Sequence, residues 1–118
     1  MIYCPRTHAY FAHPPHPWRE LRRRGVAVGL GTDSLASNPD LSIFGEAQFL
    51  ASLAAGPSPD QLLAMLTCDG ARALGAADRT SPGLTAGDAA DLTVVRPGPG
   101  DEPSILARCF AQIGRAHV

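Results

Sequence analysis

A short apolar run between two glycines constrains the fold most. Residues 26–30 read Val-Ala-Val-Gly-Leu and lie between Gly25 and Gly31. A continuous apolar run of this length is typical of a strand in a parallel sheet, because helices cover both faces of such a sheet. Helices are predicted on either side of it, over 18–24 with Gly25 as C-cap and over roughly 43–53. Helix, buried strand and helix in this order predict an α/β fold.

The segment before this unit predicts a second strand and a loop. Residues 1–4 form an apolar stub that ends at Pro5 and is interpreted as the tail of another buried strand. Residues 8–17 contain three histidines and three prolines. Because proline removes a donor and disfavours helix at the preceding residue, we expect a rigid loop here.

The sequence after residue 57 predicts a further helical stretch, and from residue 76 the spacing of apolar residues and the glycine and proline content change. Ser58, Pro59 and Gln61 predict a helix start with a capping box, with Leu62, Leu63 and Leu66 facing the core and Gly75 ending the stretch. From residue 76 the chain shows short runs punctuated by glycine and proline, including 91–95 and 105–113. This pattern predicts a small β unit over 76–118, separate from an α/β unit over 1–75.

Composition excludes several classes of protein. The chain has 118 residues and a formal net charge of −1, so it lacks the excess of positive charge that would attract nucleic acid or an anionic membrane. It also contains no apolar segment long enough to cross a bilayer. The arginine-rich run 19–24 is interpreted as the solvated face of a short helix. Three widely spaced cysteines give no disulfide framework, so a reducing cytoplasm is expected. A complete TIM barrel, at about 250 residues, is excluded by length.

The leading candidate for chemistry is Asp33, in the stretch Gly31-Thr32-Asp33-Ser34 that follows the apolar run. Ligand and catalytic sites of α/β folds lie at the carboxyl ends of their strands, where this carboxylate would stand. The alternative is that Asp33 caps the following turn or helix. The residues themselves leave both interpretations open.

Four motifs in order resemble one family. Residues 3–7 (Tyr-Cys-Pro-Arg-Thr) and 31–38 (Gly-Thr-Asp-Ser-Leu-Ala-Ser-Asn) resemble the seventh and eighth barrel strands of metal-dependent amidohydrolases, in the branch of cytosine deaminase-like, adenosylhomocysteine deaminase-like and chlorohydrolase enzymes. Residues 69–75 resemble the helix that leads to their second domain. Residues 83–92, with the closing segment 105–118, resemble the strands of its β-sandwich. The resemblance implies the end of a (β/α)8 TIM-like barrel over 1–75 and part of a β-sandwich over 76–118.

The resemblance also implies roles for individual residues. Asp33 matches the aspartate that binds or adjoins a divalent ion, zinc or iron, and takes a proton from the attacking water. The implied reaction is hydrolysis of a carbon–nitrogen bond, such as deamination, in a small cyclic substrate such as a purine or pyrimidine derivative. His8, Arg6, Ser34 and Asn38 are candidates for substrate binding. Each has a structural alternative: loop packing for His8, pairing with an acid for Arg6, and turn formation for Ser34 and Asn38.

The sequence contains no His-x-His pair, and Asp33 is one of about four ligands that the resemblance implies. We therefore expect an amidohydrolase fragment that is inactive alone and either needs the missing amino-terminal barrel portion or self-associates. Two alternatives belong to other classes. One is a binding or oligomerisation module without catalysis, and the other is a small metal-binding protein that uses the loop from His8 to His16.

Overall fold

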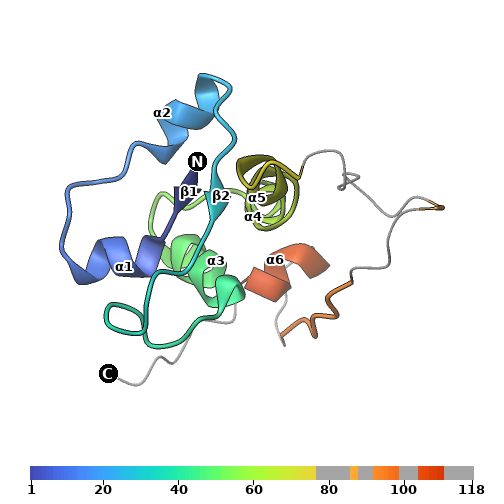
Figure 1. The fold of residues 1–118 in the computed structure, drawn as a ribbon. Helices are drawn as coiled ribbons and strands as arrows, with labels where there is room; N and C mark the ends of the chain where they lie inside the picture. Colours follow the sequence, from blue (N-terminus) through green and yellow to red (C-terminus); the bar gives the residue numbers. More distant parts are fainter. Residues whose placement is uncertain (77–85, 88–91, 99–103, 111–118) are drawn as a thin grey trace.

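Two short parallel strands lie at the centre of the structure, a computed structural model that describes residues 1–76, 86–87, 92–98 and 104–110. Strand β1 (Ile2–Tyr3) pairs with β2 (Gly29–Leu30), with Ile2 opposite Gly29 and Tyr3 opposite Leu30. Helices surround this pair (Figure 1): α1 (Pro5–Tyr10), α2 (Trp18–Arg23), α3 (Ile43–Ser52), α4 (Pro59–Leu66), α5 (Cys68–Ala73) and α6 (Ile105–Phe110). Strands with intervening helices confirm the α/β expectation for the first part of the chain.

The predicted strand at 26–30 is present but shorter. Val28 and Leu30 are buried, whereas Val26 is exposed and lies before the strand. The strand consists of the two residues that pair with Ile2 and Tyr3 of β1. The apolar stub before Pro5 is confirmed as a strand over Ile2–Tyr3, but only Tyr3 is buried, and Ile2 is 41% exposed.

Strand β2 and helix α5 are in contact through their backbones at Gly29. A Cβ atom built on Gly29 would lie 2.6 Å from the Cα of Gly70. Glycine at position 29 therefore permits the close packing of α5 against the sheet.

The predicted helices over 18–24, 43–53 and 59–74 are confirmed as α2, α3 and the pair α4–α5. At the start of α4, Ser58 accepts a hydrogen bond from the backbone N–H of Gln61, and the Gln61 side chain accepts one from the Ser58 N–H, which is the predicted capping box. One core assignment was wrong. Leu63 is 44% exposed, while Met65 is fully buried, because the buried face of α4 runs through Leu62 and Met65.

The amino-terminal loop begins later than predicted. Residues 8–10 belong to α1, which starts at Pro5, so His8 lies on a helix rather than on a loop. Arg6 lies on the same helix, so the part of 3–7 from Pro5 onward is not the strand that the resemblance implied. Pro5 occupies the first helical position, where its fixed φ suits a helix and its missing N–H needs no partner.

The expectation of a strand over the segment from Ile105 was wrong for its described part. Residues 105–110 form helix α6, and Ser104 Oγ accepts a hydrogen bond from the Ala107 N–H at its start. Phe110 is buried, and its ring lies 5.5 Å from that of Phe44 on α3. Packing against the core decides the conformation, because residues spaced by four can follow either a helical or a strand pattern.

Other expectations for 76–118 are tested only in part. Residues 92–98, which include most of the run expected as a strand over 91–95, contain no strand. The glycine-leucine motif at 83–84 and the closing segment after residue 110 lie outside the described residues. Within the described part, no helix has the length and apolar character needed to cross a bilayer.

Candidate functional site

Asp33 lies three residues after β2, with its side chain exposed. It is at the carboxyl end of the parallel strands, the position that the sequence predicts. The alternative that it caps the next helix was wrong, because Ser42 is the N-cap of α3 and its Oγ accepts from the Gly45 N–H at 3.0 Å. Within the part of the chain that the structure describes, no hydrogen bond to the Asp33 carboxylate is found, and its side chain is exposed.

Cys4 is the neighbour of this carboxylate across the sheet. A Cβ atom on Gly31 would lie 3.5 Å from the Cys4 Sγ, so the thiol packs beside the start of the loop that carries Asp33. Burial raises the pKa of the Cys4 thiol, and the negative charges of Glu46 and Asp33 raise it further. Cys4 is consequently a neutral thiol at neutral pH.

The loop between β2 and α3 is anchored by a fully buried carboxylate. The Glu46 side chain, on α3, is 0% exposed. Its Oε2 accepts from the backbone N–H of Arg6 at 2.8 Å, and its Oε1 accepts from the Arg6 Nε at 2.9 Å. The Nδ2 of Asn38, which lies in the loop, also donates to Oε1. Three donors from two separate segments compensate for the burial of this charge.

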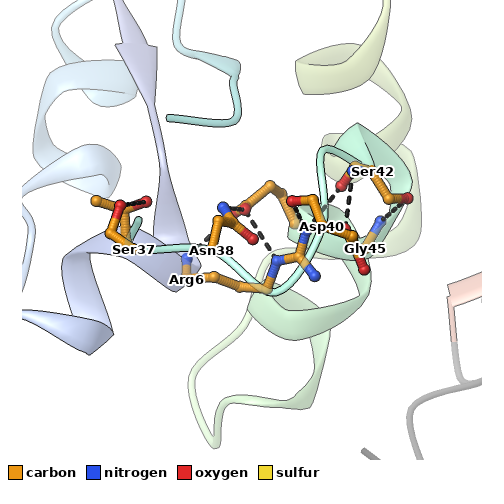
Figure 2. Close-up of polar contacts among 8 residues, drawn as sticks. Arg6, Ser37, Asn38, Asp40, Ser42 and Gly45 are labelled. Atoms are coloured by element: carbon orange, nitrogen blue, oxygen red, sulfur yellow. Dashed lines mark hydrogen bonds and ion pairs between the residues drawn. The ribbon is translucent and has the colours of Figure 1, made fainter. Parts of the chain in front are cut away.

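Arg6 extends the same cluster to the far end of the loop (Figure 2). Its Nη2 donates to Asp40 Oδ1 at 2.6 Å and to the backbone carbonyl of Ser42 at 3.1 Å. The hydrogen bond with Asp40 raises the pKa of Arg6, and the same bond lowers the pKa of Asp40. We call Arg6, Asn38, Asp40 and Glu46 the anchor cluster.

A second contact fixes the middle of the loop. Thr7 Oγ1 and Ser37 Oγ, both on buried residues, lie 3.1 Å apart, within hydrogen-bond distance. In addition, the backbone N–H of Ser37 donates to the Ser34 carbonyl at 3.1 Å, which closes a turn directly after Asp33. The loop is thus held at Ser37, Asn38 and Asp40.

The structure places the candidate substrate-binding residues in different settings. Arg6 and Asn38 come together in the anchor cluster, so the expected pairing of Arg6 with an acid is confirmed. Ser34 is exposed beside Asp33.

Sequence reasoning missed Glu46. The available signal was its place four residues before Leu50, on the buried face of a predicted helix, where an acid needs a partner.

His8 belongs to an aromatic group at the end of α1. Its Nε2 donates to the Pro14 carbonyl at 2.7 Å, and its ring meets those of Tyr3 and His16 edge-on. The rings of Tyr3 and His16 stack with their centroids 4.1 Å apart. Burial lowers the pKa of His16, and the nearby His8 lowers it further, so a neutral His16 is favoured. These contacts account for the position of His8 by packing.

The described residues do not fit a divalent metal ion by themselves. Across residues 1–76 and the shorter described segments, no group of three or more His, Cys, Asp or Glu side chains is arranged to hold one. This applies to the loop from His8 to His16 as well as to Asp33. Zinc sites use at least three protein ligands, and Asp33 offers one carboxylate next to a neutral thiol.

Comparison with known proteins places these features in a family. The amidohydrolase family profile matches residues 2–114. The 5-methylthioadenosine/S-adenosylhomocysteine deaminase of Teredinibacter turnerae is 35% identical over 102 residues, which cover 80% of this chain and 23% of that protein. The enzyme of the same name from Desulfitobacterium hafniense is 48% identical over 68 residues, or 52% of this chain and 16% of that protein.

A relative with another name also matches. The S-triazine hydrolase of Gordonia rubripertincta is 33% identical over 95 residues, covering 75% of this chain and 20% of that protein. No solved structure gave a significant match. The chain thus spans about a quarter or less of the length of these relatives. Because the family profile extends over nearly every residue, including β1, Asp33 and the anchor cluster, this chain belongs to the amidohydrolase family.

Proposed function

We propose that this chain is the carboxyl-terminal portion of an amidohydrolase that removes an amino group by hydrolysis. The observation that carries the proposal is Asp33: an exposed carboxylate at the carboxyl end of a parallel strand, on a loop fixed at three points. The relatives of this chain include enzymes named 5-methylthioadenosine/S-adenosylhomocysteine deaminase. Both compounds in that name are adenosine derivatives, which supports an adenosine derivative as the substrate class. Membership of the family supports the reaction type at the level of hydrolysis.

We further propose that β1 and β2 are the last two strands of a barrel, with a domain boundary near residue 76. In the described part of the chain, each strand pairs only with the other and so leaves one edge unpaired. Unpaired edges of parallel strands invite another strand. The remaining strands would come from the rest of the protein.

The chemistry proposed for Asp33 is proton transfer. Water adds to the ring carbon that bears the amino group, and the Asp33 carboxylate accepts the proton that the water loses. The carbon–nitrogen bond then breaks, and the proton passes from Asp33 to the leaving nitrogen, which departs as ammonia. A carboxylate positioned in this way typically contributes about 10²- to 10⁴-fold in rate.

The divalent ion that the family resemblance implies, zinc or iron, needs ligands that the described residues do not supply. We propose that those ligands lie in other parts of the protein and that the 118 residues are inactive alone. The 118-residue chain, purified by itself, is therefore expected to release no ammonia from 5-methylthioadenosine or S-adenosylhomocysteine.

The experiment that tests the role of Asp33 uses the protein expressed from the complete gene. Asp33→Asn should lower the rate of ammonia release at least about 10²-fold and leave the melting temperature unchanged, since the side chain is exposed and makes no bond among the described residues. Asp60→Asn, at another exposed carboxylate, is the matched control and should retain full activity. Near-normal rates in Asp33→Asn would overturn the proposal.

The same assay addresses the substrate. We expect ammonia from 5-methylthioadenosine or S-adenosylhomocysteine to exceed that from an amino-triazine, in line with the relatives that are named for deamination of these two compounds. A preference for the triazine would retain the reaction type and replace the substrate class.

A further inference from the structure

Glu46 is buried without an evident need for stability. A carboxylate removed from water is costly, and replacing a buried ion pair by apolar side chains is often neutral or stabilising. Yet the Glu46 side chain is 0% exposed on the same helix face as Leu50, which belongs to the apolar core. Its presence there points to a task other than holding α3 in place.

The partners of Glu46 identify that task. Arg6 belongs to the segment directly after β1, and Asn38 belongs to the loop after β2 that carries Asp33. Both segments leave the carboxyl ends of the strands, and Figure 2 shows Arg6 beside Asn38, extended toward Asp40. Glu46 therefore joins the two segments at the end of the sheet where the proposed chemistry takes place.

Asn38 depends on Glu46 for its orientation. The Asn38 side chain is buried, its Nδ2 donates to Glu46, and its Oδ1 has no partner among the described residues. Loss of the carboxylate would leave the whole amide without a hydrogen bond. The loop would then lose one of its three attachment points five residues after Asp33.

We infer that Glu46 is a positioning residue, which fixes the Asp33 loop against α1 through Arg6 and Asn38. The inference rests on the proposed function, because Asp33 is the group being positioned. It assigns to Glu46 no proton transfer and no contact with substrate.

The test is Glu46→Gln in the protein expressed from the complete gene, with two readouts. Hydrogen–deuterium exchange should rise about tenfold in residues 31–42 and remain unchanged in α4, because a charged acceptor of three bonds has been replaced by a neutral one. The kcat for ammonia release should fall about 10²-fold with KM nearly unchanged, since a displacement of about 1 Å has an effect of this size.

Two comparisons separate positioning from other roles. The pH profile of kcat/KM should keep its shape in Glu46→Gln at a lower amplitude, whereas a proton-transfer role for Glu46 would remove one limb. Glu20→Gln is the matched control, because Glu20 also pairs with arginines but lies on α2, away from the loop. It should change neither readout.

Unchanged exchange in 31–42, or increased exchange with an unchanged kcat, would overturn the inference. If the unsubstituted protein released no ammonia from any of the three substrates, the proposed function would fail, and the exchange measurement would still decide whether Glu46 fixes the loop. Should Glu46→Gln not fold, Asn38→Ala removes a single donor. It should raise exchange in 31–42 alone and lower kcat by a smaller factor.

Discussion

Two glutamates, Glu46 and Glu20, bind arginine in very different ways. Glu46 is fully buried and takes its partners Arg6 and Asn38 from 40 and 8 residues away. Glu20 is 41% exposed and pairs with Arg23 and Arg24, three and four residues later on the same helix.

The difference shows what a carboxylate–arginine pair does in each setting. On α2 the pair is local, screened by water and energetically small. In the anchor cluster it joins separate segments and cannot be broken without leaving a buried charge. Similar carboxylate–arginine pairs thus lie on the exposed surface of α2 without joining it to another segment, whereas in the anchor cluster they fix the loop between β2 and α3.

The largest effect is expected for Glu46→Ala. The substitution leaves the backbone N–H and Nε of Arg6 and the Asn38 amide without their acceptor, and we expect a loss of about 3–5 kcal/mol in the free energy of unfolding. Urea denaturation monitored by circular dichroism measures it. A loss below about 1 kcal/mol would show that the cluster relaxes freely and that burial makes no difference.

Ser58→Ala tests a neutral, local contact of intermediate size. Ser58 and Gln61 form a capping box within one turn of α4, and its loss should cost about 1 kcal/mol. Ser52→Ala, at an exposed serine near the end of α3, is the control and should stay within about 0.5 kcal/mol of the unsubstituted protein. A larger effect for Ser58 than for Glu46 would reverse the ranking of local and long-range contacts.

Asp40→Asn tests how much the charge of Asp40 contributes to stability, through its dependence on pH. The hydrogen bond from Arg6, followed by that from the Ser42 N–H, lowers the pKa of Asp40 below its ordinary 3.8. The unfolded state then binds more protons in this range, so the stabilisation is present above about pH 4 and is lost as the pH falls through the lowered pKa.

Because the Asp40 side chain is 56% exposed, we expect an effect smaller than that of Ser58→Ala. Unfolding at pH 6 should distinguish Asp40→Asn from the unsubstituted protein, and unfolding at pH 2 should not. A difference that persisted at pH 2 would assign the effect to packing rather than to charge.

The smallest effect is expected for Glu20→Ala. Its exposed pairs with Arg23 and Arg24 should contribute about 0.5 kcal/mol or less, and added salt should remove even that. Melting temperatures at low and high ionic strength provide the measurement. A loss comparable to that of Glu46→Ala would contradict the distinction drawn from burial.

The two glutamates also mark how far the sequence predicts the structure. The helices α2, α3 and α4 follow from local signals: spacing of apolar residues, the cap at Ser58 and the glycine at position 25. The position of Asp33 after a buried strand was predictable for the same reason.

Long-range contacts were not predictable from local patterns. No local pattern around Glu46 indicates that Arg6 is its partner. Similarly, the spacing of four between Leu106 and Phe110 fits a helix as well as a strand, and the packing of Phe110 against Phe44 is a long-range contact that the spacing does not reveal. Arg6 and Asn38 were predicted as candidates for substrate binding, and pairing with an acid was the stated alternative for Arg6. The bond between Asn38 and Glu46 could not be predicted, because it depends on how the loop and α3 come together.

The contact between Gly29 and α5 restricts how this sequence can change over evolution. A side chain at position 29 would meet the backbone N and Cα of Gly70, which every amino acid possesses. No substitution at position 70 can therefore compensate for a change at position 29, whereas a Cβ at position 70 itself would make only an ordinary 3.5 Å contact with the Met65 carbonyl. Position 70 can therefore accept another residue, whereas position 29 must remain glycine as long as α5 packs against β2 at this distance.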